Sequence, residues 1–243
     1  MKTVELYTPP PFVERFQYKN CIQKNNFLTR KRVYETPDGE ILPSVTTILD
    51  VTKDKTSLNA WVEREGVERA NKIKEEAAKI GTALHNNLEK FICGVERKPG
   101  NNSIHVKANA MANKIIEGGL THVDEVVAIE QSLYFPGLYS GTTDLVAVYK
   151  GNLSVCDYKQ SSKLKTVEYI EDYFLQLVSY ILAHNEVYGT DIREGHIFLC
   201  TRGHDNLKLG GETYQPFDLL PQDFNKYQDM WLDRVEKFYS ILM

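Results

Sequence analysis

The chain has 243 residues, of which 42% are hydrophobic and 26% are charged, and its formal net charge at pH 7 is −4. This composition is that of an ordinary globular protein whose length allows one sizeable core. A uniformly basic coat is excluded, so a polyanionic partner would have to be met by a local basic patch or by metal ions. We expect one domain over residues 1–243, divided into an N-terminal arm and hairpin (1–42), a helical part (43–120) and a sheet with flanking helices (121–243).

The sequence also disfavours a membrane-spanning protein and a protein with an N-terminal targeting peptide. No apolar stretch approaches the roughly 20 residues that span a bilayer, and the first 20 residues resemble neither a signal peptide nor an Arg-rich transit peptide. The four cysteines lie far apart and form no C-x-x-C pair, which predicts free thiols in a reducing compartment: Cys21, Cys93, Cys156 and Cys200.

The first half of the chain predicts an arm, a hairpin and helices. Pro9–Pro11 is typical of an extended arm, and Pro37-Asp38-Gly39 between β-prone runs predicts a hairpin over Arg32–Leu42. Ser44 is a suitable N-cap for a short helix over Val45–Leu49.

A long helical segment is predicted from Asn59 to Phe91. Apolar residues recur there at steps of three and four and form one stripe: Ile73, Ala77, Ile80, Leu84, Leu88 and Phe91. A loop over Gly94–Ser103 and a second helix over 104–117 follow.

The second half of the chain predicts strands followed and flanked by helices. The predicted elements are a strand over Val126–Phe135, a β-hairpin around residue 151, a helix over 168–188, a strand over His196–Cys200, a loop or hairpin over Gly203–Glu212 and a helix over Pro221–Leu242. The closing helix is marked by Phe224, Trp231, Val235, Phe238 and Leu242. This order of elements predicts an α/β or α+β sandwich.

The hairpin DLVAVYKGNLSVCDYKQ carries acids and a lysine in two apolar runs. Because side chains alternate along a strand, Asp157 and Lys159 share one face of the second run. A loop at Lys150-Gly151 would set Asp144 opposite Asp157, whereas a loop at Gly151-Asn152, the better two-residue turn, would set it opposite Lys159. Both registers gather the two acids and the lysine on one face, and a three-residue loop without a bulge would scatter them.

Two carboxylates opposite each other would lie about 5 Å apart at Cβ and would repel each other. A divalent cation between them removes this repulsion, and hard oxygen ligands with open water positions suit Mg²⁺ or Mn²⁺. For an arbitrary hairpin, the simpler interpretation is that the acids face solvent and pair with Lys159. Other residues therefore have to decide between a cation site and an exposed hairpin.

Two single residues favour a cation site, although each has a structural explanation as well. His85 lies one helical turn after Gly81, where the missing side chain leaves space for an ion, but a lone helical histidine is more often structural. Glu130 interrupts an apolar strand just before the hairpin, and an outward-facing position would explain it equally well.

The helix over 168–188 carries two stripes. The first is an apolar core stripe of Ile170, Phe174, Leu177 and Ile181, and the second consists of Tyr169, Tyr173, Gln176 and Tyr180. The second stripe can simply pack on the sheet, or it can offer hydrogen bonds and stacking to a nucleic-acid strand.

Four pieces of the sequence, PSVTTIL, GTALH, GTTDLVAVYKGNLSVCDYK and QLVSY, resemble the PD-(D/E)XK nuclease superfamily in its RecB-like branch. Over about residues 43–180, their order and gaps are similar to those of the mitochondrial genome maintenance exonuclease family and its phage relatives. Gln160 departs from that pattern, because such relatives usually carry Thr or Ser after the lysine. The resemblance implies a restriction-endonuclease-like mixed central sheet flanked by helices, with an arch built from residues 59–117.

The resemblance also implies roles for individual residues. Asp144 and Asp157 would bind the metal together with the Tyr158 carbonyl and His85, and Glu130 would be an outer ligand. Lys159 would orient the attacking water or stabilise the charge that develops on the phosphate. Gln176 and Tyr180 would position the lysine or the DNA backbone, and hydroxyls that could touch phosphates belong to Ser44, Thr46 and Thr47, although a plain N-cap explains Ser44 equally well.

The implied function is that of a DNA exonuclease that depends on one or two Mg²⁺ or Mn²⁺ ions, prefers single-stranded ends and acts in DNA replication, repair or recombination. We expect no iron–sulfur cluster, because the cysteines lack the necessary grouping, and no membrane partner. The expected location is the cytoplasm of a bacterium or a phage-infected cell, or a mitochondrion if a leader has been removed.

Three alternatives remain open at this point. One is a structure-specific endonuclease or junction resolvase of the same superfamily, and another is a non-catalytic nucleic-acid-binding protein on a nuclease fold. The third is a glycoside hydrolase that uses Asp144 and Asp157 as acid and base. In a glycoside hydrolase, however, the D-x-K pattern and His85 would have no role.

Overall fold

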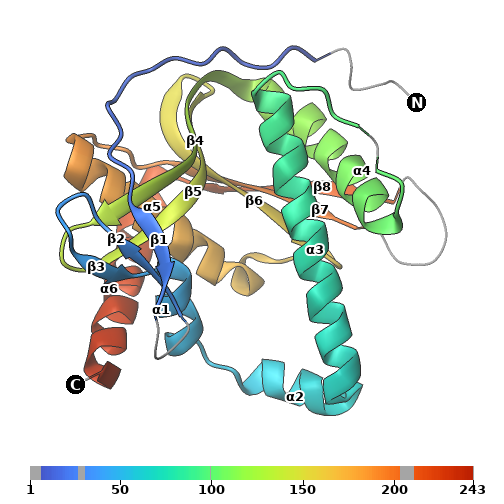
Figure 1. Cartoon of the computed structure of the whole chain (residues 1–243), viewed down its shortest axis with the longest axis horizontal. Helices are drawn as coiled ribbons and strands as arrows, with labels where there is room; N and C mark the ends of the chain where they lie inside the picture. Colours follow the sequence, from blue (N-terminus) through green and yellow to red (C-terminus); the bar gives the residue numbers. More distant parts are fainter. Residues whose placement is uncertain (1–6, 27–30, 99, 203–210, 243) are drawn as a thin grey trace.

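A mixed five-stranded sheet forms the centre of the molecule (Figure 1). The computed structural model describes residues 7–26, 31–98, 100–202 and 211–242. The strands, in their order across the sheet, are β4 (Val123–Phe135), β5 (Tyr139–Tyr149), β6 (Asn152–Ser161), β7 (Gly195–Thr201) and β8 (Thr213–Leu219). Among the neighbouring strands of this sheet in the described residues, only β6 and β7 run parallel, and α5 makes the crossover between them, as a parallel pair requires.

Helices cover both faces of this sheet, which confirms the predicted α/β fold with a mixed sheet. One face packs against α1 (Val45–Thr52), α5 (Glu171–Tyr188) and α6 (Pro221–Leu242), and the other packs against α3 (Val67–Ile92) and α4 (Ser103–Gly118). Short 3-10 turns, η2 (Leu120–His122) and η3 (Val167–Tyr169), precede β4 and α5.

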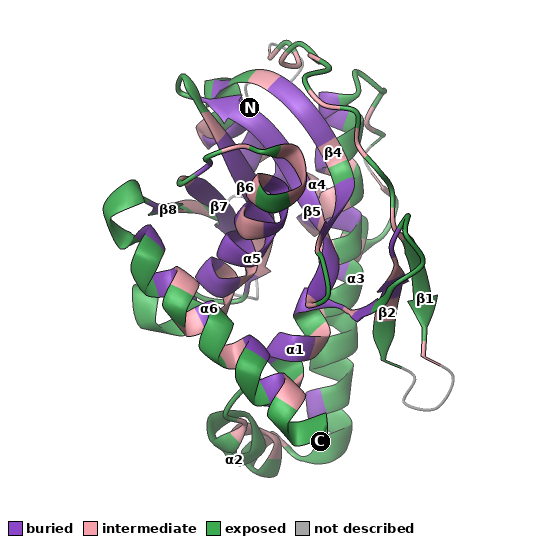
Figure 2. Cartoon of the chain, turned by 90° about the vertical axis from the view of Figure 1, so that its left-hand side faces the viewer, coloured by how far each residue is buried: buried purple, intermediate pink, exposed green. Residues whose placement is uncertain are grey.

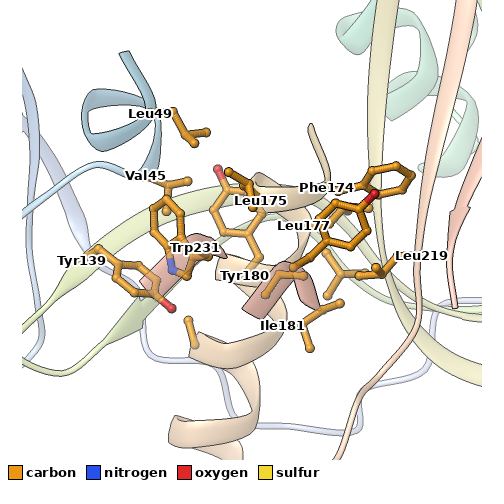
Figure 3. Close-up of a cluster of buried hydrophobic side chains, with 14 of the residues drawn as sticks. Val45, Leu49, Tyr139, Phe174, Leu175, Leu177, Tyr180, Ile181, Leu219 and Trp231 are labelled. Carbon is orange, nitrogen blue, oxygen red and sulfur yellow. The ribbon is translucent and has the colours of Figure 1, made fainter. Parts of the chain in front are cut away.

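The core beneath α5 and α6 is built around Trp231, which is fully buried (Figure 3). The Tyr139 ring meets the Trp231 ring edge-on at 5.0 Å, and the Tyr139 hydroxyl donates to the Ser179 carbonyl at 3.1 Å. Burial of such side chains contributes about 1.5–3 kcal/mol each. The predicted stripe of α6 is confirmed up to Phe238, but it is wrong for Leu242, which is 66% exposed at the end of the helix.

The long helix predicted from Asn59 to Phe91 is two helices. Gly66, with φ of 81°, separates α2 (Thr56–Glu65) from α3, because this backbone conformation cannot continue a helix. No residue of α2 is buried, and Ile73 in the first half of α3 is 36% exposed. Figure 1 shows these segments projecting away from the sheet, and most of their ribbon has the colour of exposed residues in Figure 2. The predicted apolar stripe is therefore confirmed only from Ile80 onward.

A second, three-stranded sheet lies beside the main one. It consists of β1 (Ile22–Asn25), β2 (Arg32–Glu35) and β3 (Ile41–Pro43), and it confirms the hairpin predicted around Gly39. β1 and β8 are not foreseen by the sequence patterns. Ser44 caps α1 by accepting from the Thr47 N–H at 3.0 Å, as predicted, and the helix continues to Thr52. Most of the loop predicted over 203–212 lies outside the described residues.

The N-terminal arm covers the β4 edge of the main sheet. Phe12 forms a parallel bridge with Val126, and the flanking backbone bonds are both 2.8 Å long. Covering an edge in this way blocks pairing with another chain. Within the described residues, no helix combines the length and the apolar character needed to cross a bilayer.

Candidate functional site

The turn between β5 and β6 sets the register of the site. Tyr149 pairs with Asn152, so the loop is Lys150-Gly151, and the favoured Gly151-Asn152 loop is wrong. Lys150 and Gly151 both have positive φ, 49° and 87°, as a type I′ turn requires. The Gly151 N–H also donates to Asp124 at 2.7 Å, which fixes the loop in this position.

Three neighbouring strands each contribute one acid at the same level of the sheet. The β5–β6 register, continued by one step, sets Asp144 opposite Asp157, and the β4–β5 register sets Glu130 opposite Asp144. The ladder between β5 and β6 ends at this point, and the Asp144 Oδ2 atom instead accepts a hydrogen bond from the Tyr158 N–H at 2.7 Å. Asp144 and Asp157 are only 8% and 2% exposed, so the interpretation of a solvent-facing hairpin is wrong.

His85 reaches this row of acids from α3. Its Nδ1 atom lies 3.2 Å from Asp144 Oδ1, and its Nε2 atom lies 3.0 Å from the Tyr158 carbonyl oxygen. Burial acts to lower the pKa of His85, but the Asp144 carboxylate outweighs burial and raises the pKa to about 9. The same ion pair lowers the pKa of Asp144 against the effect of burial. At neutral pH, the ring is therefore an imidazolium that donates from both nitrogens.

Asp157 forms an ion pair with Lys159, two residues further along β6. Burial and the repulsion from Asp144 raise the pKa of Asp157 to about 6, although Lys159 partly opposes them. Burial alone would lower the pKa of Lys159, but the two aspartates raise it, so Lys159 remains an ammonium group. Its Nζ atom lies 5.2 Å from the centre of the Tyr173 ring, which favours the charged form.

Glu130 has a left-handed backbone conformation and a side chain with a raised pKa. Its φ is 46°, in the left-handed region that costs a residue with a side chain about 1–3 kcal/mol. The residue as a whole is exposed, but partial burial of its carboxyl group and the nearby Asp144 raise its pKa to about 7. Backbone strain of this kind persists where the surrounding structure holds the residue in place.

The site contains a set of atoms that fits a divalent cation. One ligand atom from each of His85, Glu130 and Asp144 lies within 4.8 Å of the others. Burial first, and then the neighbouring Asp144 carboxylate, raises the pKa of Glu130, and a cation bound here would favour its charged form. Asp157 lies outside this triad and forms an ion pair with Lys159.

The remaining residues predicted for the site lie in two groups. Gln176 and Tyr180 are one turn apart on α5, and the Gln176 side chain donates to the Tyr180 hydroxyl at 3.2 Å. Ser44 is buried, and its hydroxyl bonds with Thr46 and with Thr47 at 3.0 and 2.8 Å, so the N-cap explanation accounts for the Ser44 side chain. Of these residues, Ser44, Thr46, Gln176 and Tyr180 line the same cavity as the acids.

This cavity has a volume of about 510 Å³. Its ionisable walls are formed by the residues Arg32, His85, Glu89, Glu130, Asp144, Asp157 and Lys159, with further polar side chains from Gln23, Asn86 and Thr142. Glu89 was missed by the sequence patterns, although it lies one helical turn after His85 and therefore on the same face of α3. Arg32 was missed because no local pattern connects β2 with the acids of the main sheet.

Comparison with known proteins points to exonucleases. No family model matches the chain. The chain is 28% identical over 208 residues to mitochondrial genome maintenance exonuclease 1 of Mus musculus and 27% identical over 209 residues to that of Homo sapiens. The matches cover 81% and 82% of this chain, but only 59% and 58% of the two relatives. Both relatives are named as exonucleases, and the chain spans about three fifths of their length.

A solved structure of a provisionally named exonuclease from Eubacterium rectale shows a weaker likeness. The TM-score is 0.46, the sequence identity is 10%, and the match covers 67% of each chain. At this level, the likeness defines neither a shared fold nor a shared function.

Proposed function

We propose that the protein is a metal-dependent deoxyribonuclease of the PD-(D/E)XK type that removes nucleotides from the ends of DNA strands. The observation that carries the proposal is the convergence of Glu130, Asp144 and Asp157 from three adjacent strands with His85 and Lys159 in one cavity. The similarity to two proteins named as exonucleases supports the same activity.

Mg²⁺ or Mn²⁺ would be held by His85 and Asp144, with Glu130 in the same triad and Asp157 and the Tyr158 carbonyl as further ligands. When bound, the ion supplies a water of lowered pKa and neutralises charge on the phosphate. His85 must give up a proton before it can bind a metal, because only neutral imidazole is a ligand. Asp144 orients the His85 ring and the Tyr158 peptide at the same time.

Lys159 acts on the phosphodiester itself. As a partly buried ammonium whose pKa is raised, it cannot serve as the base, so it stabilises the negative charge that grows on the phosphate oxygens and on the departing sugar oxygen. Gln176 and Tyr180 line the same cavity as Lys159 and hold the substrate backbone in position. Tyr173 lies beneath the ammonium group and helps to keep it charged.

We further propose that the substrate is single-stranded DNA in a replication, repair or recombination setting. The projecting α2 and the first half of α3 carry apolar and aromatic side chains without a core, among them Trp61 and Ile73. Such a segment can enclose an unpaired strand as an arch, because every unpaired base offers a face for stacking. Duplex DNA hides those faces.

A degradation assay tests this function. Linear and circular DNA, single- and double-stranded and end-labelled where linear, is incubated with Mg²⁺ or Mn²⁺ and followed on a gel. We expect linear single strands to be degraded, circular ones to resist, and EDTA to stop the reaction. Lys159→Ala and Asp157→Ala should lose the activity and still show the wild-type circular dichroism spectrum. Full activity of either variant, or cleavage in EDTA, would overturn the proposal.

The same assay distinguishes the second candidate, a structure-specific endonuclease. An endonuclease would cut the circular single strands as fast as the linear ones, because it does not need a chain end. The alternative of a non-catalytic protein would be supported if none of the DNA forms were cut with either metal.

A further inference from the structure

The cavity also contains a cationic side chain, that of Arg32, for which the described residues provide no hydrogen-bond or ion-pair partner. We propose that Arg32 binds a second phosphate of the nucleic-acid strand, next to the one that is hydrolysed. This inference rests on the proposed nuclease function and deepens it, because it names a substrate-binding residue outside the catalytic set.

The backbone of Arg32 is held firmly at the mouth of the site. Its carbonyl oxygen accepts from the Ser44 N–H and from the Thr47 hydroxyl, both at 3.2 Å. Two residues further along β2, the Tyr34 hydroxyl bonds with Thr142 of β5 at 3.1 Å. Arg32 is thus fixed both to the N-terminus of α1 and, through its strand, to the strand that carries Asp144.

The side chain of Arg32 is directed toward the cavity. Arg32 and Tyr34 are two residues apart on a strand and therefore share one face, and both line the cavity. Within the described residues, no hydrogen bond or ion pair engages the Arg32 guanidinium. The other permanent cation of the cavity, Lys159, is already paired with Asp157.

The charges of the cavity explain why such a residue is needed. Four carboxylates line it, from Glu89, Glu130, Asp144 and Asp157. These acids repel every phosphate of an incoming strand, and a bound cation offsets that repulsion only at the scissile one. A guanidinium binds a neighbouring phosphate through two parallel N–H donors and remains charged at any working pH. Arg32 therefore supplies the second anchor that holds the strand in register.

The test compares Arg32→Gln and Arg32→Lys with a control, Arg193→Gln, which removes the same charge from an exposed residue that is paired with Asp191. Binding of a fluorescent oligothymidine is measured by anisotropy in the Lys159→Ala background with Mg²⁺, over a range of salt. Degradation kinetics are measured in the wild-type background. Strands with and without a terminal phosphate, at the 5′ or 3′ end, separate a terminal monoester from an internal diester.

We expect Arg32→Gln to weaken binding by about tenfold and to reduce the salt slope of log K by about 0.7, the value for one contact with a single strand. KM should rise by a similar factor while kcat changes little, and Arg32→Lys should recover part of the loss. If only strands with a terminal phosphate show the effect, Arg32 binds the monoester; if all strands show it, Arg32 binds a diester.

Two results would overturn the inference, and they are distinguishable. If the wild type degrades DNA but Arg32→Gln matches Arg193→Gln in affinity, salt slope and KM, then Arg32 has no role in binding. If the wild type degrades no DNA with either metal, the proposed function fails, and this inference fails with it.

Discussion

Glu130 shows how the candidate site places backbone strain on one residue. In the middle of a strand, glycine is normally worse than alanine, but at φ of 46° the side chain is the source of the strain. We therefore expect Glu130→Gly to be more stable than Glu130→Ala by about 1 kcal/mol, reversing the usual order. Urea unfolding of both variants measures this difference. An alanine variant as stable as the glycine variant would show that the backbone is not strained.

His184 gives the protein a stability that depends on pH. It is fully buried between Tyr18 and Thr190, and burial lowers its pKa from 6.5 to about 4. Above pH 6.5, the ring is neutral in both the folded and the unfolded chain. As the pH falls from 6.5 to 4, the unfolded chain takes up a proton that the folded chain resists, so stability is lost. The difference between these pKa values corresponds to about 3 kcal/mol.

The measurement compares wild type with His184→Gln, whose amide retains hydrogen-bonding atoms. Urea unfolding between pH 7.5 and pH 4 should show the wild type losing about 3 kcal/mol more than the variant. Other titrating groups contribute equally to both proteins and cancel in the comparison. Parallel pH dependences of the two proteins would contradict the assignment.

The site residues differ in how far the sequence could predict them. Asp144, Asp157 and Lys159 were placed together because alternation along a strand fixes their faces in either register. His85 was predicted from its helical position and the motif around it. The short distance between Glu130 and His85 depends on the register of β4 against β5. The position of Arg32 at the cavity depends on how a separate sheet packs against the main one. Neither is a property of local sequence.

Among the elements, the β5–β6 turn shows why a loop position can be mispredicted. Gly151 occupies the second central position of the turn and leaves Lys150 in the left-handed region, where asparagine is far better tolerated. We expect Lys150→Asn to stabilise the protein by about 0.5–1 kcal/mol, and Lys150→Val, which is β-branched, to destabilise it. Thermal and urea unfolding measure both changes. A valine variant as stable as the asparagine variant would mean that the turn has another conformation.

The limits of a helix were predicted well where the helix buries a single apolar stripe. The limits of α4 and α6 agree with the sequence within a residue or two, since each presents one apolar stripe to one core. The break between α2 and α3 was missed because Gly66 alone does not prevent a helix; the bend also requires that no core hold the two segments in line. At the start of α3, Ala70 is buried, but Val67 and Ile73 of the same segment remain exposed.

At the scale of the whole molecule, metal binding should be visible as stability. An ion that binds only the folded protein stabilises it by about 2.7 kcal/mol at a hundred times its dissociation constant. We expect Mn²⁺ to raise the unfolding temperature of the wild type. Asp144→Asn should abolish this effect, because it removes one acid of the triad and the partner of His85. An equal rise in both proteins would place the ion elsewhere.

The architecture was predictable because its signals agree with one another. The order of strands and helices predicted an α/β or α+β sandwich, and the resemblance implied a mixed central sheet. The acids predicted on neighbouring strands lie where β5 and β6 separate. That α2 and the first half of α3 form an arch was only an expectation from the resemblance. No pattern within those segments specifies the shape that they adopt.

The most direct test of the central claim is the single-turnover rate of phosphodiester hydrolysis on an end-labelled single strand with saturating Mn²⁺, compared between the wild type and Asp144→Asn. Losing one carboxylate of the triad should remove about 4 kcal/mol of transition-state stabilisation, a loss of about a thousandfold in rate. Circular dichroism of the variant should match that of the wild type. Hydrolysis by Asp144→Asn at the wild-type rate would contradict the proposal that these acids hold the catalytic ion.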